Sequence, residues 1–255
     1  MDKNNFFSLL VIGDNPEDMM KKYNEDYEVE PYIKYYFKDK DKLFKNRIKI
    51  FEEILKNKEY FSNQKLIDEI RISLSKMRRM DSFDYYRDLT VGLTYDENGN
   101  AITDENPESR YSTYSQTLNF ITPLYITDEN NNTKEVTTAT KGEINWDLLH
   151  LNPERKLIFS NTWELCVDKR EPQNDIEQTI LNNMKNADKY FNRFNSKNDY
   201  VLYNTSFWTY AILTEKTGWI DMDDMTDFEW IINFFDNYIK PLDDNERLTI
   251  FECRK

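Results

Sequence analysis

Five carboxylates lie within nine positions near the C-terminal end of the chain, in the segment GWIDMDDMTDFEW (residues 218–230). They are Asp221, Asp223, Asp224, Asp227 and Glu229. Metal-dependent nucleases and phosphoesterases gather several carboxylates around one or two Mg²⁺ ions, so the segment offers the ligand types that this chemistry needs. It is therefore a candidate magnesium site.

Helix-capping and turn chemistry explains the same segment without a metal. The pattern Thr226-x-x-Glu229 is a capping box directly before an apolar-periodic segment, and Asp227 falls in the first turn, where negative charge is favourable. Asp221 and Asp223 alternate with apolar residues, as on the solvated side of a strand end. The sequence thus favours turn and cap residues here, with no metal and no cofactor.

The residues of acid–base and nucleophilic catalysis are sparse. The one histidine, His150, lies near Asp147, and the two cysteines, Cys166 and Cys253, stand in unrelated contexts. A Ser-His-Asp hydrolase would need a G-x-S-x-G elbow, which is absent. Gly13 follows an apolar run, but neither a dinucleotide fingerprint nor a phosphate loop surrounds it. A non-enzymatic role is favoured.

An exposed aromatic residue beside acidic ones is typical of a protein-binding surface. Of the five tryptophans, Trp219 stands next to a turn and to the acidic segment, so we expect it to be partly exposed. Apolar patterns place three others in the core, namely Trp163, Trp208 and Trp230. We expect a partner-binding surface composed of Trp219, Asp221, Asp223, Asp224, Asp243 and Asp244.

Charge is unevenly spread along the chain, whose net charge is −13. Residues 32–80 hold fourteen Lys and Arg against seven Asp and Glu, whereas residues 215–252 hold three against eleven. Binding to nucleic acid requires a high density of basic residues, so the acidic total argues against direct nucleic-acid binding as the main function. We expect a protein partner with a basic surface, while the basic stretch leaves a local contact open.

The composition is that of a folded chain, with 39% hydrophobic and 15% aromatic residues. Two cysteines are too few for a secreted disulfide framework. No apolar run approaches the roughly 18–20 residues of a membrane span. We expect a cytoplasmic protein that does not bind membranes.

Periodicity predicts the elements that position these residues. A strand over residues 5–12 precedes a helical subregion at about 14–80, and hairpins follow at about 88–140. Helices are expected after Asn152-Pro153, around residues 171–184 and over residues 226–240. Strands are expected over residues 200–214 and 247–253. We expect a single α+β domain over residues 1–255, in which the N- and C-terminal strands join a mainly antiparallel sheet covered by helices.

Three segments, NFFSLLVIGDNPEDMMKKY, DSFDYYRDLTVGLTYDENGN and IKPLDDNERLTIFECRK, resemble uncharacterised proteins encoded by tailed phages of low-GC hosts. This resemblance implies expression in a bacterial cytoplasm and carries no activity or site residue. The leading hypothesis is an acidic, non-enzymatic protein-binding factor, such as an inhibitor of a host or defence nucleic-acid-binding protein. The alternatives are a magnesium-dependent phosphoesterase or nuclease that uses Asp221–Glu229, and a minor virion protein.

Overall fold

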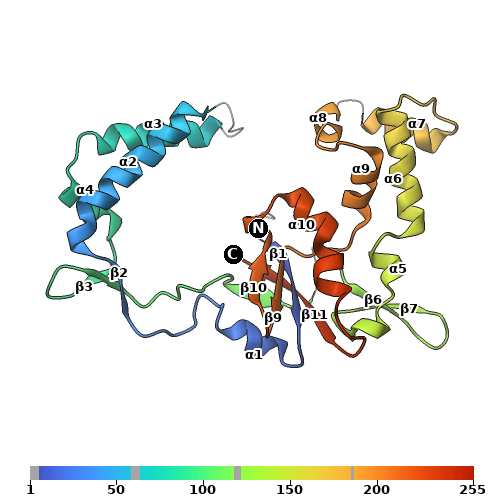
Figure 1. The fold of residues 1–255 in the computed structure, drawn as a ribbon, viewed down its shortest axis with the longest axis horizontal. Helices are drawn as coiled ribbons and strands as arrows, with labels where there is room; N and C mark the ends of the chain where they lie inside the picture. The colour runs from blue at the N-terminus through green and yellow to red at the C-terminus, as the bar shows by residue number, and fades with distance from the viewer. Residues whose placement is uncertain (1–5, 59–63, 118–121, 185–186) are drawn as a thin grey trace. The chain divides into compact units, whose positions relative to one another are not determined.

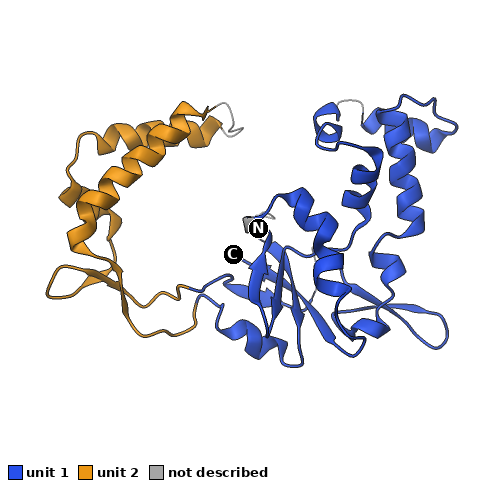
Figure 2. Ribbon diagram, in the orientation of Figure 1, with its two compact units in different colours: residues 1–25, 108–255 blue, residues 26–107 orange. Residues whose placement is uncertain are grey.

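The computed structural model of the chain describes residues 6–58, 64–117, 122–184 and 187–255. The chain divides into two compact units, which Figure 2 draws in different colours. Unit 1 consists of Met1–Glu25 and Glu108–Lys255, and unit 2 is the intervening segment Asp26–Pro107. Unit 2 is thus an insertion into the sequence of unit 1. Whether the two units unfold together as one domain, as the sequence predicts, stays a prediction.

The centre of unit 1 is a six-stranded sheet (Figure 1). Its strands are β1 (Phe6–Ile12), β5 (Thr113–Ser115), β8 (Thr138–Thr140), β9 (Ala211–Thr214), β10 (Gly218–Asp221) and β11 (Arg247–Arg254). Their order is β10-β9-β1-β11-β5, and β8 also pairs with β11. β1 runs antiparallel to β11 and parallel to β9, and the remaining pairs are antiparallel. The predicted α+β fold, with the N- and C-terminal strands in one mainly antiparallel sheet, is confirmed.

The two faces of this sheet form two separate cores, because side chains alternate along each strand. Leu10 and Ile12 lie on one face, with Ile212, Leu248 and Ile250. That face packs against α10 (Asp227–Phe234), whose last turn continues as the π-helical turn η6 (Phe235–Ile239). The other face carries Leu9, Val11, Leu213, Phe251 and Cys253, and it packs against α1 (Pro16–Lys21) through Met20.

A group of helices in unit 1 has its own aromatic core, which includes Trp163, Phe191, Phe194 and Tyr200. The helices are α6 (Pro153–Cys166), α7 (Asp175–Asn183), α8 (Asp188–Phe191) and α9 (Lys197–Thr205), whereas the preceding α5 (Trp146–Leu149) packs on the first face of the sheet. As predicted, α6 begins after Asn152, whose side chain accepts a hydrogen bond from the Arg155 N–H.

The predicted strand over residues 200–214 is wrong in its first half, which is the helix α9. The Ser196 side chain caps this helix by accepting a hydrogen bond from the Asp199 N–H. Tyr200 and Tyr203 then lie on the aromatic core, so tertiary packing prevails over the β-propensity of the segment. Trp208, predicted to be buried, lies in the link to β9 with 37% of its surface exposed. Trp163 and Trp230 are buried as predicted.

Unit 2 combines helices with a three-stranded sheet of order β2-β4-β3. Its elements are β2 (Tyr32–Tyr35), η2 (Phe37–Asp39), α2 (Lys40–Lys56), α3 (Gln64–Met77), α4 (Ser82–Leu89), β3 (Thr94–Tyr95) and β4 (Ala101–Thr103). The apolar stripes of α2 and α3 meet at Phe51, Ile70, Leu74 and Met77, which confirms these two helices. The predicted helical subregion at about 14–80 is wrong over Tyr32–Tyr35, which form β2 and pair with β4. No helix among the described residues is both long and apolar enough to cross a membrane.

Two hairpins share one loop design, and both were predicted. In β3–β4, Asp96 accepts hydrogen bonds of 2.9 Å from the N–H groups of Asn98 and Asn100, and Gly99 has a φ of 76°. The hairpin of β6 (Leu124–Thr127) and β7 (Thr133–Val136) repeats this pattern with Asp128, which accepts from Asn130 and Asn132 at 2.9 Å. The Asp-Glu-Asn triplets at these two positions are therefore turn sequences.

Candidate functional site

The predicted acidic segment borders a pocket of about 270 Å³, which we call the polar pocket. It is lined by Glu25, Ser109, Arg110, Tyr111, Ser112, Asp221, Asp223 and Lys255. Asp221 ends β10, and Asp223 lies in the short 3-10 helix η5 (Met222–Asp224) that follows. Arg110 arrives from a segment more than a hundred residues earlier, because Asn24 and Tyr111 form a β-bridge. The structure thus places two of the predicted aspartates beside two cations.

Trp219 lies among aromatic residues that pack on the sheet face next to the polar pocket. Its ring lies 5.3 Å from Tyr23, 6.2 Å from Phe7 and 6.4 Å from Tyr111 between centroids, the last in a stacked arrangement. Its indole Nε1 donates a hydrogen bond of 3.0 Å to Asp221 Oδ2. Trp219 is partly buried, as predicted, and it packs against the core of this face.

An ammonium group occupies one side of the polar pocket. The Lys255 Nζ donates a hydrogen bond of 2.8 Å to the Tyr210 hydroxyl and lies 3.2 Å from Asp223 Oδ2. It also lies over two rings, at 5.0 Å from the Tyr210 centroid and 5.9 Å from that of Phe7. Hydrogen bonding to Tyr210, followed by that to Lys255, lowers the pKa of Asp223 below its ordinary value. Asp223 is thus held in its ionised form.

Two of the remaining carboxylates of the segment, Glu229 and Asp227, have structural partners outside the polar pocket. The Thr226 hydroxyl accepts a hydrogen bond of 3.3 Å from the Glu229 N–H, so the predicted N-cap of α10 is confirmed. The predicted capping box is incomplete, because Glu229 Oε2 accepts from the Thr226 hydroxyl at 2.9 Å and not from its backbone N–H. Asp227 forms an ion pair of 3.5 Å with Arg193. The side chain of Asp224 lies outside the described residues. Across the described part of the chain, no three His, Cys, Asp or Glu residues are grouped so that they could hold a metal ion.

Asp243 and Asp244, which the sequence analysis joined to Asp221, lie at the opposite end of the sheet. The strand register places Asp221 opposite Ala211, the first residue of β9, and Asp223 after it lies beside Lys255, which follows the last residue of β11. Asp243 and Asp244 instead precede β11, whose first residues pair with the last residues of β1. The two predicted groups of carboxylates therefore do not form one surface.

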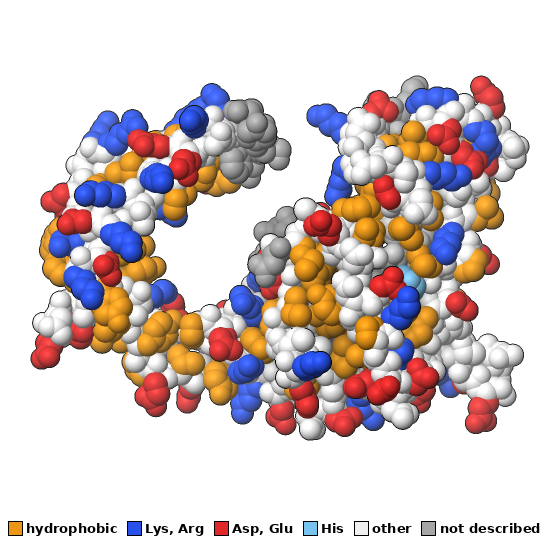
Figure 3. Space-filling view, in the orientation of Figure 1, with side chains coloured by type: hydrophobic (Ala, Val, Ile, Leu, Met, Phe, Trp, Pro, Cys, Tyr) orange, Lys and Arg blue, Asp and Glu red, His pale blue; other side chains and the backbone are white. Residues whose placement is uncertain are grey.

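The end of the sheet that holds Asp243 and Asp244 collects exposed carboxylates from four neighbouring strands. We call this surface the acidic rim and define it as Asp14, Glu143, Glu215, Asp243, Asp244 and Glu246. The Gly13 N–H bonds the Arg247 carbonyl at 3.0 Å, and the Gly142 N–H bonds the Asp244 carbonyl at 2.9 Å, which ties the loops together. In Figure 3, red carboxylates interspersed with blue cations follow the lower edge of this unit.

Two of the cations at the rim neutralise little of its charge. Arg247 lies 3.6 Å from Asp14, and Lys141 lies 3.6 Å from Asp244. Asp14 and Asp244 remain 89% and 83% exposed in these pairs, so water screens both interactions. The rim stays negative and open to solvent.

His150 has a structural environment. It follows α5, and its Nδ1 accepts a hydrogen bond of 3.2 Å from the Phe207 N–H, which requires the proton of the neutral ring to be on Nε2. The ring stacks on Phe235 with centroids 3.8 Å apart. Burial lowers the pKa of His150 to about 4.

Cys166 and Cys253 are buried in different cores, and burial raises the pKa of both thiols.

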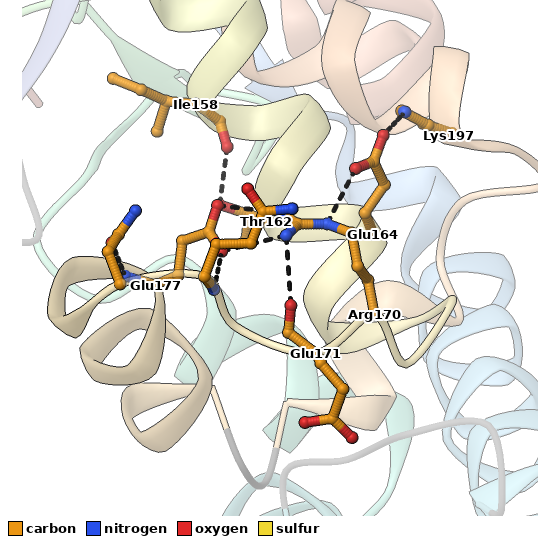
Figure 4. A network of polar contacts seen from close by, with 9 residues as sticks. Ile158, Thr162, Glu164, Arg170, Glu171, Glu177 and Lys197 are labelled. Atoms are coloured by element: carbon orange, nitrogen blue, oxygen red, sulfur yellow. Dashed lines mark hydrogen bonds and ion pairs between the residues drawn. The ribbon is translucent and has the colours of Figure 1, made fainter.

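A network of ion pairs in the helical part of unit 1 joins α6, α7 and α9 (Figure 4). Arg170 contacts both carboxylate oxygens of Glu177, at 2.9 and 3.0 Å, and its Nε donates to Glu164 at 3.1 Å. Glu177 also accepts the Gln173 N–H, and Glu164 also accepts from Lys197. Each charged group is matched by a partner from the same network, so we assign it to holding the helices together.

Sequence reasoning missed Arg110, Lys255 and the serines of the polar pocket, because no local pattern marks them. The signal that the sequence does carry is the alternation Trp219-x-Asp221, which puts both side chains on one face of a strand.

Comparison of this chain with protein-family models, with curated proteins and with solved structures found no match.

Proposed function

We propose that this chain is an acidic protein-binding factor whose acidic rim docks onto a basic surface of a partner protein. The observation that supports the proposal is the convergence of exposed carboxylates from the ends of β1, β8, β9 and β11. The loops that carry them are fixed by the sheet register and by backbone hydrogen bonds. A preformed charged surface binds with little loss of conformational freedom.

The distribution of charge between the units supports the same reading. Unit 1 holds 30 Asp and Glu against 19 Lys and Arg, a net charge of −11, whereas unit 2 holds 17 against 15, a net charge of −2. Nearly all the excess negative charge is thus on the unit that carries the rim. Such a field accelerates encounter with a basic partner.

The biological setting is part of the proposal. The resemblance to proteins of tailed phages suggests that the partner is a host or defence protein and that binding takes place in the bacterial cytoplasm. A basic groove that normally holds nucleic acid would be the natural complement of the rim. The chain would then act as an inhibitor by occupying that groove.

The experiment is affinity capture from bacterial cells with a matched pair of variants. The rim variant carries Asp243→Asn, Asp244→Asn and Glu246→Gln. The control variant carries Glu129→Gln, Glu135→Gln and Glu154→Gln, which change the net charge equally at exposed positions outside the rim. We expect one partner to be retained by the wild type and the control, lost from the rim variant and displaced by excess double-stranded DNA. Equal capture by all three proteins would refute the role of the rim.

A further inference from the structure

The polar pocket lies at the end of the sheet away from the acidic rim, and the proposed docking function makes no use of it. Its walls come from β10, η5, the end of β11 and the segment around Arg110. The aromatic residues Trp219 and Tyr111 stack beside it. Charged groups of both signs thus meet in a hollow that adjoins an aromatic surface.

The charges in the pocket are only partly matched with one another. Asp223 and Lys255 form an ion pair, so they neutralise each other. Asp221 accepts two hydrogen bonds, from the Trp219 indole and from the Asp223 N–H, and both donors are neutral. Among the described residues, the exposed side chains of Arg110 and Glu25 form no hydrogen bond or ion pair, although the positive charge of Arg110 also helps to lower the pKa of Asp223. One guanidinium and two carboxylates therefore lack an ion-pair partner of their own.

The pocket already shows how it holds a cationic side chain. The Lys255 ammonium is bound by a carboxylate, a phenol oxygen and the faces of two aromatic rings. This combination is a general way to recognise alkylammonium and guanidinium groups. The neighbouring space offers two further carboxylates, Asp221 and Glu25, whereas Tyr111, which also lines it, is only 3% exposed and stacks on Trp219.

We propose that the polar pocket binds a free basic amino acid, arginine or lysine. Arg110 pairs with the α-carboxylate, since a guanidinium matches a carboxylate in a bidentate arrangement. Asp221 and Glu25 pair with the α-ammonium and with the cationic side chain. The ligand carries one negative and two positive groups, which complement the one positive and two negative groups that the pocket leaves unmatched. The volume of about 270 Å³ lies just below the roughly 300–1,000 Å³ of typical ligand pockets, so the pocket admits only a small ligand.

The test is calorimetric titration of the full chain with L-arginine, with L-lysine and with agmatine, which keeps the guanidinium but lacks the carboxylate. For the wild type we expect one site and an affinity for agmatine lower on the order of tenfold, because the contact with Arg110 is lost. In Arg110→Gln, arginine and agmatine should bind equally. In Asp221→Asn, the amide oxygen can still accept the hydrogen bond from the Trp219 indole. The affinities for arginine and for agmatine should both fall in this variant.

The control variant is Arg79→Gln, which removes an exposed arginine of unit 2 and should bind arginine as the wild type does. Circular dichroism of each variant establishes that it is folded before titration. The proposal is overturned if neither arginine nor lysine binds at millimolar concentration. It is equally overturned if Arg110→Gln binds arginine as tightly as the wild type, or if agmatine matches arginine in the wild type.

Discussion

The Trp219 indole donates a hydrogen bond of 3.0 Å to Asp221, the residue two positions further along the same strand. Both side chains lie on the same face of the sheet. Trp219, which the sequence suggested as a binding anchor, also packs against Tyr23 and Phe7 on this face. We expect Trp219→Ala to lower the free energy of unfolding by roughly 2–4 kcal/mol. Trp219→Phe, which keeps most of the packing, should lower it by about 1 kcal/mol. Urea unfolding measures both changes. A free energy of unfolding in Trp219→Ala equal to that of the wild type would contradict the packing role.

The protein should be more stable when the Tyr200 side chain lacks its hydroxyl. Its side chain is fully buried, and its oxygen is the one buried side-chain N or O atom without a hydrogen-bond partner among the described residues. We expect Tyr200→Phe to raise the free energy of unfolding by about 1 kcal/mol, because a buried unpaired hydroxyl is costly. Tyr111→Phe is the matched control. It should lower stability, since its hydroxyl donates to the Met20 carbonyl at 3.2 Å. A loss of stability in Tyr200→Phe would show that the hydroxyl is paired.

His150 should stay neutral far below its ordinary titration range. Its pKa in the fold is about 4, below the 6.5 of an exposed histidine. The neutral ring therefore contributes stability above pH 6.5, and this contribution is lost as the pH falls from 6.5 towards 4. The chain has one histidine, so its ring signals in NMR need no assignment. Titration near pH 6.5 in the folded protein would contradict the hydrogen bond from the Phe207 N–H.

Magnesium should leave the melting temperature unchanged. Asp221 and Asp223 bond to Trp219 and Lys255, and Glu229 is part of a helix cap, so these carboxylates have structural partners. A specific site at a hundred times its dissociation constant would add about 2.7 kcal/mol. Thermal unfolding in millimolar Mg²⁺ or Mn²⁺ measures the effect. A large rise that Asp221→Asn with Asp223→Asn abolishes would favour the phosphoesterase hypothesis.

Features encoded by neighbouring residues were predictable from the sequence. The caps at Asn152 and Thr226 and the turns at Asp96 and Asp128 each depend on residues at most four positions apart. Periodicity likewise predicted most helices, including the one around residues 171–184 that the structure has as α7.

Features that depend on strand order and register were not predictable. The sequence suggested that Asp221 and Asp244 share a surface, but the register of β1 with β9 and β11 puts them at opposite ends of the sheet. Arg110 is placed at the polar pocket by its own N–H, which bonds the Tyr23 carbonyl at 2.8 Å, and by the hydrogen bond from the Asn24 side chain to the Ser112 carbonyl. No pattern within a short window carries that information.

The most direct test of the acidic rim is the rate at which the captured partner associates with the chain across a salt series. Screening acts over about 10 Å at 0.1 M salt, so steering by the rim should fade as salt rises. We expect the association rate of the wild type and of the control variant to fall steeply with salt. The rim variant should associate slowly at low salt and respond little to added salt. Equal rates for all three proteins at every salt concentration would contradict the account.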